Sequence, residues 1–320
     1  MIFLMVINVL KFLGGVSILV FILFGICYPV IFYNDWLINK HIEDRTKKSN
    51  QKFEKKEKEL VGKRFFVERK DKRAVRCNLY LFEDDGIRPL IILLHGGDFL
   101  HGDSDEIDRE AERLRIDMDC NVVSVSYSLI EMHLNTYSQE EIADVFEYCR
   151  THAQELHCDQ GKIVFCGIEA GGYLGILAGK IALEKYGFGP QGYFLLDPYV
   201  DYTQLSMCQA RMHPQPVMLM RFGDLREMTE MEKLFAQTYQ KNKVFRFMNR
   251  DNPDAMHMCD RYAEEMMRND IYYIYKNYPR LTLADFMSDG FFLDEETKPI
   301  RQEALAEIKE NIAFFTRSRK

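Results

Sequence analysis

Apolar residues along this chain gather in short runs, and several of the stretches between these runs show helical spacing instead. The apolar runs predict buried strands at 89–94, 121–129, 162–168, 216–222 and 243–248. Amphipathic or small-residue patterns predict helices at 140–146, 173–179, 225–240 and 302–315. Because strands alternate with helices, we expect a mostly parallel central sheet with helices on both faces.

One predicted strand runs directly into a helix through a turn that is flanked by glycines. Residues 162–168 form the strand, Glu169 stands at the tip, and Gly167 and Gly171 lie two residues before and after it. A tip residue in such a sharp turn has a strained backbone, so its neighbours must lack bulk. This is the shape of a nucleophile elbow, although an ordinary tight turn would explain this stretch taken alone.

A second motif lies upstream, where the run 89–94 ends in His95, Gly96 and Gly97. Glycine-rich loops of this kind, placed after a buried strand, bring backbone N–H groups together to hold an oxyanion. Only glycine allows the chain such a close approach. The two motifs together are far more specific than either one.

The pair of motifs resembles the α/β-hydrolase family, and within it the hormone-sensitive-lipase-like carboxylesterases. Their pattern is His-Gly-Gly-Gly upstream and Gly-Asp-Ser-Ala-Gly-Gly at the elbow. The likeness extends from about residue 74 to the C-terminus and implies the α/β-hydrolase fold. By this resemblance, the backbone N–H groups of Gly97, Asp98 and Ala170 form the oxyanion hole.

The same resemblance implies a triad acid and base on late strands, in that order. Asp224 follows the predicted strand 216–222 and matches the acid, while His257 follows 243–248 and matches the base. Asp224 has an alternative role as the N-cap of the helix predicted at 225–240. The eight histidines show no spacing typical of a metal site, so we expect neither a metal nor a cofactor.

The tip residue departs from the family pattern, because Glu169 stands where the pattern has the serine nucleophile. Ile168 and Asp98 also replace the aspartate and the third glycine of the pattern. A carboxylate at the tip would occupy the oxyanion hole itself, and it would favour the imidazolium form of His257. We therefore expect a catalytically impaired fold with a binding or regulatory role and a small ester, a lipid or a protein as its ligand.

A working hydrolase is the alternative. Here Glu169 would act as the nucleophile or as the general base for water, together with His257 and Asp224.

The amino-terminal part predicts a membrane anchor. Residues 1–33 carry one charge, Lys11, and the uncharged run 12–33 is long enough to span a bilayer. A cleavable signal peptide is the rival interpretation, but the run lacks a good cleavage site. Between residues 40 and 73 there are 14 basic and 7 acidic side chains, which favours a single-pass protein whose folded domain is cytoplasmic.

The sequence thus divides into an anchor at 1–33, a basic linker at 34–73 and an α/β-hydrolase-like domain at 74–320. The domain carries the negative charge of the chain, which argues against nucleic acid as a partner. The eight cysteines show no close pair and are expected to be free thiols, although their even number is compatible with disulfides. The aromatic residues at 271–275 and 291–293 predict either packing against the domain, which we favour, or a lid over the pocket.

Overall fold

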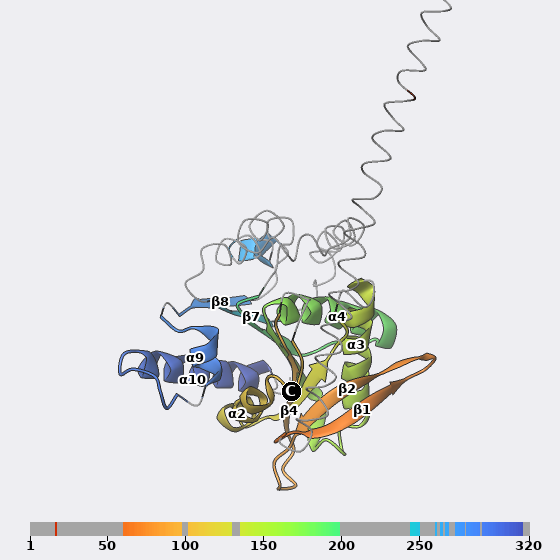
Figure 1. Ribbon diagram of the computed structural model, residues 1–320, viewed down its shortest axis with the longest axis horizontal. Coiled ribbons are helices and arrows are strands. Elements are labelled where there is room, and N and C mark those ends of the chain that lie inside the picture. Colours follow the sequence, from red (N-terminus) through yellow and green to blue (C-terminus); the bar gives the residue numbers. More distant parts are fainter. Residues whose placement is uncertain are drawn as a thin grey trace, which may run out of the picture. The chain divides into compact units, whose positions relative to one another are not determined.

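The computed structural model in Figure 1 divides into two compact units, Met1–Glu57 and Lys58–Lys320. Only Ser17, in a helix, is described in the first unit. In the second unit the described residues are 60–97, 102–129, 135–198, 244–249, six residues between 260 and 268, 273–278, 280–288 and 290–315.

The described part of the second unit is built on a single sheet of eight strands in the order β1-β2-β4-β3-β5-β6-β7-β8. The strands are β1 (Lys63–Arg69), β2 (Lys72–Tyr80), β3 (Arg88–Leu94), β4 (Asn121–Ser126), β5 (Cys158–Ile168), β6 (Gly192–Leu196), β7 (Val244–Asn249) and β8 (Tyr273–Asn277). Strand β2 runs antiparallel to β1 and β4, and the other neighbours are parallel. The prediction of a mostly parallel sheet is confirmed.

Helices cover both faces of this sheet (Figure 1). They are α2 (Asp108–Met118), α3 (Asn135–Thr151), α4 (Ala170–Tyr186), α9 (Leu283–Met287) and α10 (Thr297–Phe315). Side chains of β3 alternate between the faces, since successive residues of a strand point to opposite sides. Leu90 and Ile92 pack in the apolar cluster with α3 and α4, while Ile91 and Leu93 pack in the cluster with α2, α9 and α10.

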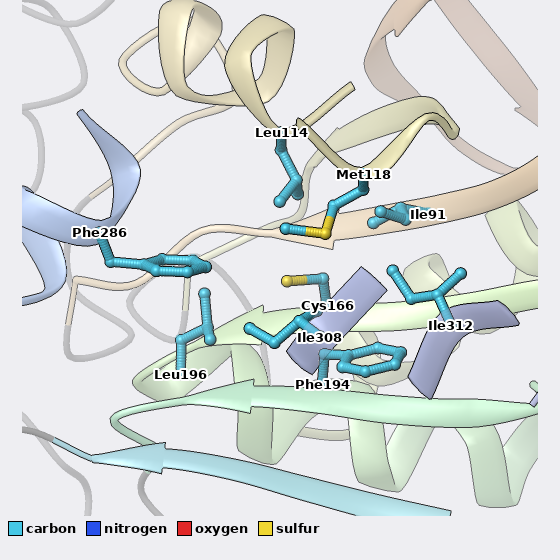
Figure 2. A pocket seen from close by; sticks show the side chains of 9 residues that line it. All are labelled: Ile91, Leu114, Met118, Cys166, Phe194, Leu196, Phe286, Ile308 and Ile312. Atoms are coloured by element: carbon cyan, nitrogen blue, oxygen red, sulfur yellow. The ribbon is translucent and has the colours of Figure 1, made fainter. Parts of the chain in front are cut away.

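A small apolar cavity lies in the second of these clusters (Figure 2). It is lined by Ile91, Leu114, Met118, Cys166, Phe194, Leu196, Phe286, Ile308 and Ile312. No polar side chain lines this space, so it is an imperfection of core packing rather than a site for polar chemistry.

The sheet begins earlier in the chain than the domain start predicted at residue 74. Strands β1 and β2 pair along their length, beginning with Lys63 of β1 opposite Leu79 of β2. Residues 63–73 therefore belong to the sheet and not to a linker. The edge strand β1 and its neighbour β2 are rich in charge, and even the buried Arg69 is ion-paired, with Asp144 at 2.6 Å. Their composition therefore resembles that of a basic linker.

The late strands also differ in part from the prediction. Strand β7 corresponds to the predicted strand 243–248 and pairs in parallel with β6, while β8 pairs with β7. Residues 273–277 thus lie in the sheet, as packing rather than lid formation predicts. The same prediction is wrong for 291–293, because Phe291 and Phe292 are exposed. His257 falls between β7 and β8 in the chain. The strand predicted at 216–222 and the helix predicted at 225–240 lie outside the described residues.

The predicted anchor at 1–33 also lies outside the described residues, apart from Ser17. Among the helices that are described, none combines the length and the hydropathy needed to cross a bilayer.

Candidate active site

Glu169 occupies the tip of the turn between β5 and α4. Its backbone has φ 47° and ψ −115°, a conformation that residues with a side chain rarely adopt. The turn is fixed by two backbone hydrogen bonds, because Glu169 N donates to Leu196 O at 2.9 Å and Gly172 N donates to Glu169 O at 3.0 Å. The sheet and the helix thus hold Glu169 in a strained position.

The flanking glycines are required by close backbone contacts. A Cβ atom on Gly167 would lie 2.4 Å from the Cα atom of Gly172. A Cβ atom on Gly171 would lie 2.3 Å from the carbonyl oxygen of His95. Both obstacles are main-chain atoms that cannot rotate away, so the turn tolerates only glycine at these two positions.

The loop after β3 is ordered by His95 and Tyr127. The Tyr127 hydroxyl donates to the His95 carbonyl oxygen at 2.6 Å, and the two rings stack with centroids 4.1 Å apart. The His95 side chain is buried, and its Nδ1 lies 2.7 Å from Gly96 O. His95 therefore orders its own loop, and the loop carries Gly97 in a left-handed conformation with φ 107°.

The two loops meet at the Glu169 carboxylate. The backbone N–H of Gly97 donates to Glu169 Oε2 over 3.3 Å. A side chain on Gly96 would collide with the same oxygen, since its Cβ atom would lie 2.6 Å away. Ala170 is the first residue of α4, where helix N–H groups have no partner within the helix and favour negative charge.

Burial, and next to it the charge of Glu169, raise the pKa of Tyr127. Its phenol is therefore protonated at neutral pH and remains the donor to His95 O. The negative charge of Glu169 strengthens this arrangement rather than opposing it, because it disfavours a phenolate nearby.

After residue 101, one buried and one half-buried carboxylate, Asp105 and Asp103, connect the chain to the sheet. Asp105 accepts from Arg64 at 2.6 Å and from Asn78 at 2.8 Å, while Asp103 pairs with Arg76. Burial raises the pKa of Asp103 to about 6, against the opposing charge of Arg76. These contacts fasten the far end of the loop to β1 and β2.

The structure thus brings Glu169, Gly97 and Ala170 together at the carboxyl ends of β3 and β5. Asp98, Asp224 and His257, the other residues predicted for the site, lie outside the described residues. Within the parts of the chain that are described, no three His, Cys, Asp or Glu side chains gather in a way that could hold a metal ion.

Two residues near the site were not predicted. Tyr127 supports the loop of His95. Asp197 follows β6 and has φ 48°. It lies beside the turn that carries Glu169, because Ile168 at the end of β5 pairs with Leu196 at the end of β6. No sequence pattern marks the contact of Tyr127, which depends on the neighbouring positions of β3 and β4. The glycine-poor segment around Asp197 likewise gives no signal of a left-handed backbone.

A carboxylate in this position can accept hydrogen bonds from the loop, and it can serve as a base or a nucleophile. It cannot supply the hydroxyl that a serine hydrolase uses to form an acyl-enzyme.

Known proteins share this architecture. A sequence profile of the alpha/beta hydrolase fold matches residues 91–258. The thermostable carboxylesterase EstE1, cloned from a metagenomic library, superposes with a TM-score of 0.66 at 16% identity, over 79% of this chain and 90% of that one. A hyperthermophilic esterase from Pyrobaculum calidifontis gives a TM-score of 0.62 at 18% identity, over 85% and 93% of the two chains.

Among curated proteins, the carboxylic ester hydrolase LipN of Mycobacterium tuberculosis is 31% identical over 123 residues. The alignment covers 37% of this chain and 33% of LipN, so the match spans about a third of that relative. The profile covers more than half of the chain, and the sheet order and the glycine-flanked turn agree with it. The chain belongs to the α/β-hydrolase fold family.

Proposed function

We propose that this protein is a membrane-anchored member of the family in which Glu169 replaces the serine nucleophile, so that the site binds a ligand instead of hydrolysing it. The observation that carries the proposal is the hydrogen bond from Gly97 N to Glu169 Oε2 at 3.3 Å. The carboxylate thus accepts the N–H of one residue, Gly97, that the family resemblance assigns to the oxyanion hole of an esterase.

A negative charge at this place opposes ester hydrolysis in two ways. An attacking hydroxyl is missing, so no acyl-enzyme forms by the serine route. A developing oxyanion would also meet the charge of Glu169 instead of unoccupied donors, which raises the barrier that these donors normally lower. The ligand class we propose is a small ester or a lipid, supported by the ester hydrolases among the similar proteins.

The anchor is part of the same proposal. The uncharged run 12–33 supports a single span, and the basic excess at 40–73 supports a cytoplasmic position of the folded domain. The full chain should resist extraction from membranes by alkaline carbonate, and a chain that lacks residues 1–33 should be released. Release of the full chain would refute the anchor without affecting the site.

An active hydrolase is the second candidate, and the strained backbone of Glu169 favours it. Left-handed conformations of residues with side chains cluster at active sites, where strain is retained because the reaction needs the geometry. In this mechanism Glu169 would act as nucleophile or general base, with Asp224 and His257 as partners.

The two candidates separate in one experiment. Wild type, Glu169→Ser and Glu169→Gln are each assayed with p-nitrophenyl acetate and butyrate and with a fluorophosphonate probe. We expect no turnover and no labelling of wild type, and labelling of Glu169→Ser, because the variant restores a hydroxyl beside the Gly97 N–H. Equal thermal unfolding of all three proteins controls for folding.

Turnover by wild type that is lost in Glu169→Gln would establish the active hydrolase and refute impairment. If neither wild type nor Glu169→Ser shows turnover or labelling, the result would support a binding role in which further parts of the catalytic machinery are changed as well.

A further inference from the structure

Two adjacent aromatic side chains project from the turn between α9 and α10. Phe291 is 76% exposed and Phe292 is 93% exposed, and their rings contact each other edge to face at 5.0 Å. Single exposed hydrophobic residues are common on protein surfaces, but a contiguous pair of large rings is the kind of patch that marks an interaction site. We call these two residues the Phe291–Phe292 pair.

A buried arginine, Arg301, forms hydrogen bonds with the chain just before the pair. The Arg301 side chain is almost fully buried, and its Nε donates to the carbonyl oxygens of Asp285 at 3.2 Å and Phe286 at 3.1 Å. Its Nη2 donates to Ser288 O and to Asp117 Oδ2, the latter at 3.0 Å. A charged side chain is thus buried to fix the end of α9.

The turn after the pair is also fixed. Asp294 Oδ1 accepts from the backbone N–H groups of Glu296 at 3.0 Å and Thr297 at 2.7 Å, which caps the start of α10. Rings carried by such a braced turn lose little conformational entropy when a partner covers them, which favours binding.

Charge around the pair indicates what can cover it. Residues 280–298 contain five acidic and two basic side chains. Glu295 and Glu296 are largely exposed, and they pair with Lys298 and Arg280 respectively. The cytoplasmic leaflet of a membrane is negatively charged, so an acidic surround opposes insertion of the pair into anionic lipid. A positively charged protein surface is complementary instead.

We propose that the Phe291–Phe292 pair docks a folded protein partner that offers an apolar pocket bordered by lysine or arginine side chains. The rings would fill the pocket as central anchors, and the acidic side chains would steer and orient the complex from the rim. This surface is independent of the chemistry at Glu169, so it stands whether or not the protein is a hydrolase.

The test begins with a photo-crosslinking phenylalanine analogue at position 292 of the full chain, expressed in its native cells. The matched control carries the same analogue at position 188. Phe188 is also an exposed phenylalanine, 54% accessible, but it is a single ring covered by the Arg150 guanidinium. The protein captured from position 292 is then purified, and its affinity for the full chain is measured.

We expect Phe292→Ala to weaken that affinity more than 10-fold, and Glu295→Lys to weaken it several-fold. Raising the salt concentration should weaken binding by wild type more than binding by Glu295→Lys. Phe188→Ala should leave the affinity unchanged. Because Phe292 is exposed, Phe292→Ala should also melt at the wild-type temperature, which separates lost binding from lost folding.

Four results would overturn the proposal. These are cross-links from position 292 to phospholipid, cross-links to a second copy of this chain, labelling no stronger than from position 188, and an affinity that Phe292→Ala does not change.

Discussion

Two carboxylates of this protein accept a backbone N–H from a neighbouring loop, but they do so in different ways. Glu141 in α3 is 2% exposed and accepts from Ser128 N at 2.6 Å and from Ser128 Oγ at 2.9 Å. Its Oε1 also lies 3.7 Å from Arg69. Glu169 accepts from Gly97 N over a longer 3.3 Å, and it does so from a left-handed backbone.

The difference separates a role in folding from a role at a site. Burial raises the pKa of Glu141, while its hydrogen bonds from Ser128 and the charge of Arg69 oppose the shift. Glu141 sits in a regular helix and joins the loop after β4 to α3, so its contacts stabilise the fold. The contact of Glu169 is longer, and the turn that carries Glu169 has a strained backbone, which indicates that stability is not the reason for a carboxylate at this position.

The strongest test of this comparison removes Glu141. Glu141→Ala should lower the free energy of unfolding by about 3 kcal/mol, because the Ser128 groups and the buried Arg69 lose a charged partner. Glu140→Ala is the matched control on the same helix, since Glu140 is partly exposed, pairs closely with Lys72 at the surface, and lies farther from the Arg69 guanidinium, at 3.8 Å, than Asp144 does at 2.6 Å. It should cost no more than about 1 kcal/mol. If urea denaturation shows that Glu141→Ala and Glu140→Ala lose the same free energy of unfolding, Glu141 does not have the structural role assigned to it in this comparison.

A smaller effect is expected at the turn that carries Glu169. Gly171→Ala should lower the free energy of unfolding by about 2 kcal/mol, because its Cβ atom would lie 2.3 Å from His95 O. That carbonyl is also held by Tyr127, so it cannot easily move away. In Gly161→Ala, the new Cβ atom would meet only Asp159 Oδ1, at 3.4 Å. This control should change stability by less than about 0.5 kcal/mol, and a tolerated Gly171→Ala would show that the turn is not constrained as the contacts suggest.

How far the sequence predicts this fold depends on how each strand is buried. Strands β3 and β5 are buried on both faces, so they appear as continuous apolar runs, and α10 was predicted from its apolar stripe. Strand β1 forms the edge of the sheet and β2 lies next to it, and both carry many charges, so their sequence resembles the basic segment before them. Strand β6 is only five residues long and was not predicted, because so short a run gives little periodicity.

The site was predicted where it rests on local motifs. The glycines around Glu169 and the pair Gly96 and Gly97 can be recognised in the sequence, because backbone segments that approach each other closely require glycine. The stacking of Tyr127 on His95 follows from the register of β3 on β4, where Leu94 pairs with Val125, and register leaves no such signal in the sequence. Asp224 and His257 remain predictions from the family resemblance.

The smallest expected effect has the opposite sign and separates the two carboxylates most directly. Glu169→Gly should raise the free energy of unfolding by about 1 kcal/mol. Relief of a strained left-handed conformation gains about 1–3 kcal/mol, and the added flexibility of glycine in the unfolded chain costs about 0.5–1 kcal/mol. Glu169→Gln is the control, because it removes the charge but keeps the strain, so its stability should stay near that of wild type.

A stabilised Glu169→Gly beside a destabilised Glu141→Ala, measured in the same urea titration, would mean that the protein retains a carboxylate at the turn at a net cost in stability. Such a cost is typical of residues kept for binding or catalysis. If Glu169→Gly instead loses as much stability as Glu141→Ala, the Glu169 carboxylate is a structural bridge between the two loops. The argument for a functional role at the turn would then fail, whichever activity the esterase assays detect.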